Sequence, residues 1–189
     1  MAAAERYTRT AMILHWAVAL LIVTNVGLAL SWPHVADENV RPLIDNHKSI
    51  GITVLGLAIL RLLWRFGHRP PPFPVHYAGW ERWSAHAVHY GLYLVMFAMP
   101  LSGWIMDSAW KDAATHPMYF WHGFEWPRIG FVMALPPETR LTIHDLFAAM
   151  HELVAYLLYL LLFLHVAGAL KHQFVDKQAE LQRMGVGRG

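Results

Sequence analysis

Residues 143–172 read IHDLFAAMHELVAYLLYLLLFLHVAGALKH. The stretch is long enough to cross the hydrocarbon core of a bilayer, which takes roughly 20 apolar residues in a helix. It also carries His151 and His165. An ionisable side chain inside a membrane helix is costly and usually has a function. The stretch therefore predicts both a membrane-spanning helix and a site within it.

Three further apolar stretches of spanning length precede this one, at residues 11–32, 47–66 and 84–106. The composition also indicates a membrane protein, because only 15% of the residues are charged, whereas a typical soluble domain carries about 25%. The run 11–32 lacks a convincing cleavage site and is too long for a signal peptide, so we expect it to be retained. The sequence predicts an all-α fold, an integral membrane four-helix bundle in which residues 1–189 form one domain.

The segments between the spans have their own signals. Residues 33–46 are short and polar and are predicted to be a loop, and the Pro-rich stretch 70–74 cannot be helical. The longest connection, residues 107–142, is rich in Trp, Phe and Tyr. We expect it to fold onto the bundle or to lie in the membrane interface rather than extend freely into water.

Basic residues predict the orientation. Ten of the fifteen Lys and Arg residues fall on the side of the two termini and of the connection 67–80. The other side carries Arg41, Lys48, Lys111, Arg128 and Arg140. Because cytoplasmic segments of membrane proteins are enriched in Lys and Arg, both termini are expected to be cytoplasmic.

The histidines of the spans fall into two depths. Alternating helix direction places His15 and His165 toward the cytoplasmic side, and His47 and His151 toward the opposite side. His151 and His165 are fourteen residues apart, which is close to four helical turns or about 21 Å along one face. One helix can therefore supply an axial ligand to each of two stacked haems, and two other helices supply the opposite ligands.

The absence of cysteine narrows the chemistry. It excludes thiolate-bound iron–sulfur clusters and thioether attachment of haem through C-x-x-C-H. Neutral imidazole suits iron, and two imidazoles leave no open position, so such a b-type haem carries electrons and does not bind oxygen. Any one of these histidines taken alone could instead be a packing residue or part of a proton path.

Three further histidines lie near the cytoplasmic level. His86 and His89 share one face of the third span, and either could compete as the inner ligand or bond a haem propionate. His172 lies two turns beyond His165 at the membrane surface, where it could reach a quinone head group.

Several motifs resemble the bacterial cytochrome b561 family, whose members include the superoxide oxidase type. The matching stretches are RTAMILHW (9–16), RPLI (41–44), HKSIG (47–51), MHE (150–152) and LHVAGALKH (164–172). The resemblance covers nearly the full length. The histidine pattern is its specific part, whereas the apolar remainder is not.

The resemblance implies two b-type haems with the ligands His15, His47, His151 and His165, and it implies that His86 and His89 are not ligands. It also implies the bacterial inner membrane, ubiquinone as electron partner, and His172 as the quinone-site histidine. Arg9, Arg61 and Arg65 lie at the level of the inner haem and are expected to pair with its propionates. The alternative is that these arginines reflect positive-inside topology alone.

Three functions remain open at this point. In the first, superoxide gives electrons to the outer haem and ubiquinone receives them, with Arg41 and Lys48 attracting the anion beside His47. However, the outer side carries nine acidic residues against five basic ones, so strong overall steering of an anion is not expected. The second is an electron-transfer subunit with a docked redox partner protein. The third is a haem-free transporter or scaffold. None involves nucleic acid.

Overall fold

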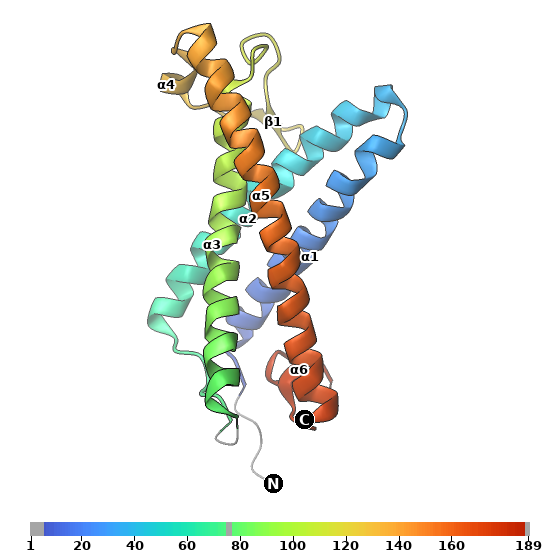
Figure 1. Ribbon diagram of the computed structural model, residues 1–189, viewed down its shortest axis with the longest axis vertical. Helices are drawn as coiled ribbons and strands as arrows, with labels where there is room; N and C mark the ends of the chain where they lie inside the picture. The colour runs from blue at the N-terminus through green and yellow to red at the C-terminus, as the bar shows by residue number, and fades with distance from the viewer. Residues whose placement is uncertain (1–5, 75–76, 188–189) are drawn as a thin grey trace.

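The computed structural model describes residues 6–74 and 77–187, and most of them are helical (Figure 1). The long helices are α1 (Arg9–Ser31), α2 (Asp37–Gly67), α3 (Gly79–Ala109) and α5 (Pro137–Leu170). The shorter elements are a 3-10 turn (Trp32–His34), β1 (Tyr119–Phe120), β2 (Phe124–Glu125), α4 (Gly130–Met133), a π-helical turn (Lys171–Val175) and α6 (Glu180–Arg183).

The bundle consists of two helix pairs. Helices α3 and α5 pack together along the long axis of the molecule, and the hairpin of α1 and α2 crosses them at an angle (Figure 1). The backbone N–H of Tyr7 donates to the Arg183 carbonyl at 3.2 Å, so the two ends of the described chain meet. We call this the inner end, and the end that carries β1, β2 and α4 the outer end.

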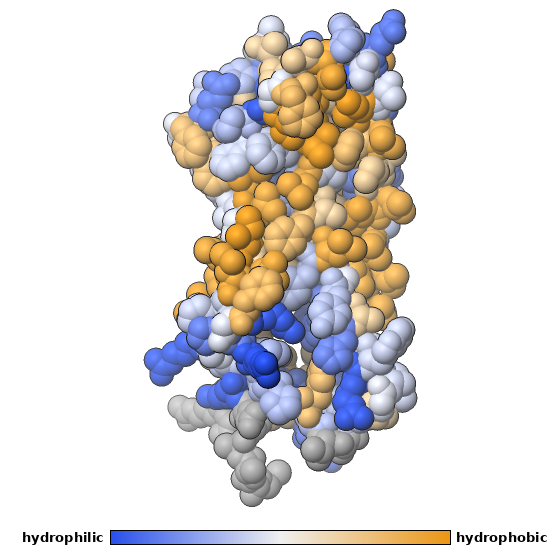
Figure 2. All heavy atoms as spheres, turned by 90° about the vertical axis from the view of Figure 1, so that its left-hand side faces the viewer, coloured by the Kyte–Doolittle hydropathy of each residue, from blue (hydrophilic) through white to orange (hydrophobic). Residues whose placement is uncertain are grey.

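The four long helices each have the length and composition needed to cross a membrane. Large apolar side chains project from them, with Leu20 68% and Phe163 69% exposed. Hydrophobic side chains cover the middle of the molecule, and hydrophilic ones gather toward the inner end (Figure 2). Continuous exposed apolar surface of this kind is stable only in contact with lipid or another protein.

Two small buried clusters hold the helices together. One joins the α1–α2 hairpin to α3 through Val18, Ile50, Val54, Ala58 and Met96. The other joins α3 to α5 through Val95, Leu158 and Leu161. A Cβ atom at Gly91 would lie 3.1 Å from the Leu161 side chain, so this glycine lets α3 and α5 approach closely.

The helices begin and end at different residues from the predicted spans. The prediction of a loop at 33–46 is wrong for residues 37–46, because α2 begins at Asp37. Asp37 and Glu38 stabilise its positively polarised N-terminus, and Pro42 in the second turn removes only one helical hydrogen bond. The last long helix also begins early, at Pro137, where proline is favoured in the first turn. The long connection is therefore residues 110–136 rather than 107–142.

Of the two alternatives expected for this connection, folding onto the bundle or lying in the interface, the structure shows the first. The Ser49 hydroxyl on α2 accepts from the backbone N–H of Trp121 at 3.0 Å and lies 3.3 Å from the Tyr119 carbonyl. The Trp121 indole donates to the Thr53 hydroxyl at 3.0 Å. The β1–β2 hairpin thereby lies against α2 at the outer end.

Candidate functional site

The outer histidine pair joins α2 to α5. The ring centroids of His47 and His151 are 6.2 Å apart. The Nδ1 atom of His47 lies 3.3 Å from the Asn25 carbonyl on α1. Because a carbonyl only accepts, this nitrogen carries the proton, and the Nε2 lone pair of His47 is left available.

His151 is oriented in the same way by α3. Its Nδ1 atom lies 2.9 Å from the hydroxyl of Ser102, and that hydroxyl donates its own hydrogen to the Met99 carbonyl at 2.9 Å. Ser102 therefore accepts from His151 Nδ1–H, which leaves Nε2 as the free nitrogen. Hydrogen bonding through one nitrogen is how proteins orient histidines that bind metal through the other.

A cavity of about 400 Å³ adjoins this pair. Its wall includes both imidazoles, and most of the remaining lining is apolar and comes from α1, α2, α3 and α5. Its volume falls within the range of roughly 300–1,000 Å³ that is usual for ligand sites. Gly103 lines it without a side chain, and a Cβ there would lie 3.3 Å from the His151 ring.

The inner histidine group draws on three helices. The ring centroids of His15 on α1 and His165 on α5 are 6.0 Å apart. His89 on α3 is a third member, with its centroid 5.2 Å from that of His165. The buried Nδ1 atom of His15 has no hydrogen-bond partner among the described residues. At least one buried nitrogen of this group is therefore not hydrogen-bonded to another described residue.

Two of the three predicted arginines gather at this level. The guanidinium carbons of Arg61 and Arg65 lie 5.5 and 5.7 Å from the ring centroid of Tyr93, which is one turn from His89 on α3. These are cation–π distances. Arg9 is exposed at the first residue of α1.

The two cations predicted to attract superoxide are each paired with a carboxylate. Arg41 Nε lies 3.1 Å from Asp45 Oδ2, and Lys48 Nζ lies 2.6 Å from Asp107 Oδ1. Asp107 is buried and also accepts from Arg128 Nε at 2.8 Å. No local sequence pattern connects Asp107 or Arg128 to Lys48, so this pairing is visible only in the structure.

Arg128 also connects the outer connection to this cluster. Its guanidinium donates to the carbonyls of Ala113 and His116. The buried cluster Lys48–Asp107–Arg128 therefore has a formal charge of +1 and fixes the segment that follows α3.

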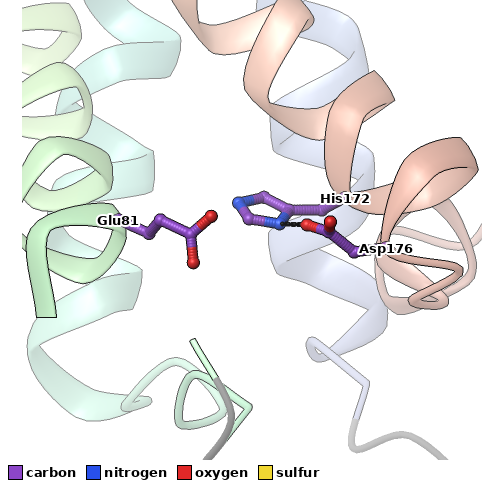
Figure 3. A group of neighbouring side chains, drawn as sticks. All are labelled: Glu81, His172 and Asp176. Carbon is purple, nitrogen blue, oxygen red and sulfur yellow. Dashed lines mark hydrogen bonds and ion pairs between the residues drawn. The ribbon is translucent and has the colours of Figure 1, made fainter. Parts of the chain in front are cut away.

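His172 lies on the π-helical turn, in a polar cluster at the inner end to which α3 contributes Glu81 (Figure 3). Its Nδ1 atom is 2.6 Å from Asp176 Oδ2, and its ring stacks on Tyr77 with a centroid separation of 4.1 Å. Lys171 Nζ lies 2.8 Å from Asp176 Oδ2 and also binds Glu81. Asp176 was not among the predicted site residues, although its i, i+4 spacing from His172 on a helix was the available signal.

The family description "Prokaryotic cytochrome b561" matches residues 6–187. This chain belongs to the prokaryotic cytochrome b561 family. The motif resemblance of the sequence is thus confirmed. Members are membrane electron-transfer proteins that bind b-type haem, and this cytochrome b561 chain is a bacterial membrane protein of that kind.

Individual members of the family are similar in sequence to this chain over nearly its whole length. "Cytochrome b561 homolog 2" of Escherichia coli (strain K12) is 32% identical over 190 residues, covering 95% of this chain and 91% of the relative. "Probable superoxide oxidase CybB" of Yersinia pestis is 25% identical, with 95% of this chain and 96% of the relative covered. "Cytochrome b561 homolog 1" of Escherichia coli (strain K12) is also 25% identical, with coverages of 95% and 97%.

The residues of this cytochrome b561 fit b-type haem. Metal–imidazole bonds of about 2 Å on opposite sides of one iron would separate the ring centroids by roughly 6 Å. The observed separations are 6.2 Å for the outer pair and 6.0 Å for the inner pair. The outer pair also has its Nδ1 atoms occupied and an apolar cavity beside it.

Proposed function

We propose that this cytochrome b561 holds two b-type haems and carries electrons through the bilayer between a donor at the outer end and ubiquinone at the inner end. The observation that carries the proposal is the arrangement along α5. This helix presents His151 and His165 at two depths. The ring centroid of each lies 6.2 or 6.0 Å from that of a histidine on another helix, which is about the separation expected for two imidazoles that bind one iron. His47 and His151 are proposed as the outer ligands, and His15 and His165 as the inner ones.

When bound, the two haems supply one-electron redox chemistry at two depths of the membrane. The four imidazoles would hold the two haems, and bis-histidine ligation would suit the irons to electron transfer rather than to the binding of other ligands. Arg9, Arg61 and Arg65 are proposed to offer positive charge to propionates at the inner level. The mostly apolar walls of the outer cavity, contributed by the four helices, would limit the access of water to the haem there.

His172 is proposed to bind the quinone head group. It lies at the inner end of the fourth span, beyond His165, in a polar cluster to which α3 contributes Glu81. An apolar quinone tail in the bilayer would bring the head group to this depth. Both termini are proposed to face the cytoplasm, in the inner membrane, because most Lys and Arg residues lie at this end.

Superoxide is the first candidate donor. It would give up one electron at the outer end and leave as dioxygen. Similarity over nearly the full length to a relative named as a probable superoxide oxidase supports this candidate. In this reading Lys48, which lines the outer cavity next to His47, and Arg41 are the cations that attract the anion.

A docked redox protein is the second candidate, and the outer-end charges favour it. Lys48 and Arg41 are each paired with an aspartate, and the outer side has nine acids against five bases. A basic partner surface would complement this end better than an anion does.

The experiment begins with the reduced-minus-oxidised spectrum of the purified protein and its haem-to-protein ratio. The proposal expects a b-type α-band and two haems per chain, and a haem-free protein would overturn it in favour of a transporter or scaffold. Rapid mixing with superoxide then separates the donors. Haems that stay oxidised with superoxide but are reduced by ubiquinol would exclude the superoxide reading.

A further inference from the structure

In the polar cluster around His172, the Asp176 carboxylate is hydrogen-bonded to the imidazole ring. Asp176 directly follows the π-helical turn, and its Oδ2 atom lies 2.6 Å from His172 Nδ1. A carboxylate only accepts when ionised, so Nδ1 carries the proton, and Nε2 is the nitrogen that faces away from Asp176. Figure 3 shows this second ring nitrogen pointing toward the side of Glu81 on α3.

The ring of His172 is fixed from a second direction. Tyr77 stacks on it with an interplanar angle of 16°, and the Tyr77 hydroxyl donates to Glu180 Oε1 at 2.7 Å. Burial raises the pKa of the Tyr77 hydroxyl, and the bond to Glu180 adds to this rise, so Tyr77 remains a neutral donor. The imidazole is therefore held by Asp176 at one edge and by Tyr77 on one face.

The charge on Asp176 is maintained by Lys171. The ammonium group bridges Asp176 and Glu81, and its hydrogen bond lowers the pKa of the Asp176 carboxyl. Glu81, His172 and Asp176 each have a polar atom within 4.8 Å of the others, a spacing that also suits a divalent cation. Here the Lys171 ammonium already supplies the positive charge between the two carboxylates. The charged and titratable groups around His172 and Tyr77 are Glu81, Lys171, Asp176, Glu180 and Arg183.

We infer that Asp176 is a positioning residue for quinone protonation: it orients His172 and stabilises its imidazolium form, so that His172 Nε2–H donates a proton to the quinone oxygen. The arrangement is that of a carboxylate behind a general acid–base histidine. This inference rests on the proposed function, since it requires quinone at His172.

The step balances with the groups named. Ubiquinone becomes ubiquinol by gaining two electrons and two protons. A b-type haem held by His15 and His165 would supply the electrons one at a time, and one proton comes from His172 Nε2–H. The second proton, and the proton that recharges His172, come from water at the inner end. Neither Asp176 nor Lys171 changes its charge in the step.

The test is stopped-flow reoxidation of the dithionite-reduced holoprotein by a short-chain ubiquinone, across a range of pH. Asp176→Asn keeps the shape of the side chain and removes its charge. We expect the reoxidation rate at saturating quinone to fall at least about tenfold at pH 7, because positioned proton transfer contributes factors of this size or more. The quinone concentration that gives half of this rate should change little. The alkaline limb of the pH–rate profile should move to lower pH, because the imidazolium loses its counter-charge.

Two variants serve as controls. Asp145→Asn is the matched change at an exposed aspartate of the outer end, whose side chain pairs with the neighbouring His144, and it should leave rate and profile unchanged. Asp176→Glu restores the carboxylate and should return the alkaline limb toward its original pH. A merely structural role for Asp176 would lower the rate without moving the limb.

The outcomes separate the two proposals. If ubiquinone does not reoxidise the reduced wild-type protein, the proposed function fails, and the inference fails with it. If the wild type is reoxidised and Asp176→Asn keeps its rate and pH profile, only the inference is overturned. If Asp176→Asn does not take up haem, Lys171→Gln is measured instead. Without the Lys171 ammonium, the Asp176 carboxylate pairs with His172 alone and stabilises its imidazolium form more strongly. The alkaline limb should therefore move to higher pH, and an unmoved limb overturns the inference.

Discussion

The two histidine layers of this cytochrome b561 are built differently. In the outer layer the Nδ1 atoms of His47 and His151 are held by the Asn25 carbonyl and the Ser102 hydroxyl, and a cavity lies beside the rings. In the inner layer the Nδ1 atom of His15 is buried without a partner among the described residues, and His89 adds a third imidazole. The two outer imidazoles, which we propose as haem ligands, are oriented by hydrogen bonds within the protein. The inner layer has three imidazoles, one more than a single bis-histidine haem would need.

This difference has a physical consequence. Hydrogen bonds to the second nitrogen orient a ligand histidine and raise its basicity, so the outer site should hold its haem through a rigid ligand pair. The inner site lies close to Arg61 and Arg65 instead, whose charges would favour an anionic cofactor at this end. If each layer binds one haem, as proposed, we therefore expect the two haems to respond separately to substitution.

The largest effect is expected from the ligands themselves. His165→Ala or His15→Ala should remove the inner haem and spare the outer one, and His47→Ala or His151→Ala should do the reverse, because a b-type haem is held chiefly by its axial bonds. Haem content and the α-band spectrum measure this. His144→Ala, also on α5 but outside both layers, is the control. A His15→Ala/His151→Ala double variant that keeps one haem intact would contradict the pairing.

The next effect concerns the scaffold of the outer end alone. Asp107→Asn leaves the buried Arg128 and the partly buried Lys48 without their counter-charge, which typically costs about 3–5 kcal/mol for a buried pair. We expect a lower unfolding temperature and faster proteolysis within residues 110–136. Asp45→Asn, which breaks the more exposed pair with Arg41, should cost less than about 1 kcal/mol. Equal losses in the two variants would mean that the buried cluster does not anchor this segment.

A smaller effect is expected when a single hydrogen bond to an outer-layer histidine is removed, and it should be confined to the outer haem. Ser102→Ala removes the acceptor of His151 Nδ1–H and is expected to weaken outer-haem retention about 10- to 100-fold, leaving the inner haem unchanged. Ser84→Ala is the matched control, since the Ser84 hydroxyl donates to a carbonyl three residues earlier on α3, as Ser102 does, but forms no hydrogen bond to a layer histidine among the described residues. Haem transfer to a competing apo-protein gives the retention of each haem. Loss from the inner site would refute the assignment of Ser102 to the outer layer.

The smallest effect is expected for His89→Ala. If His15 and His165 are the inner ligands, removing the third imidazole should leave both haems bound and six-coordinate, with at most a minor shift of the inner α-band. Low-temperature optical and EPR spectra measure this. An inner haem that is lost or becomes five-coordinate would make His89 a ligand instead.

Helix depth was accessible from the sequence because rise per residue is constant. His151 and His165 are separated by four turns whatever surrounds them, so their two levels, and the partners expected at each level, could be predicted without a structure. The sequence also excluded thiolate chemistry and predicted the four spans, because apolar length and the absence of cysteine are independent of packing. It placed the beginnings of α2 and α5 too late, since polar helical turns beyond the apolar stretch leave no hydropathy signal.

What surrounds each histidine was decided only by the tertiary structure. Ser102 reaches His151 across 49 residues of sequence, and Lys48 reaches Asp107 across 59. Such pairs depend on how each helix is rotated about its axis and on where the connection 110–136 returns, and neither quantity has a local sequence signal. The same holds for Tyr77 against His172, which meet because the segment before α3 packs on the end of α5. Sequence thus determined the depth of the histidines in this protein, and packing decided which neighbours orient and charge them.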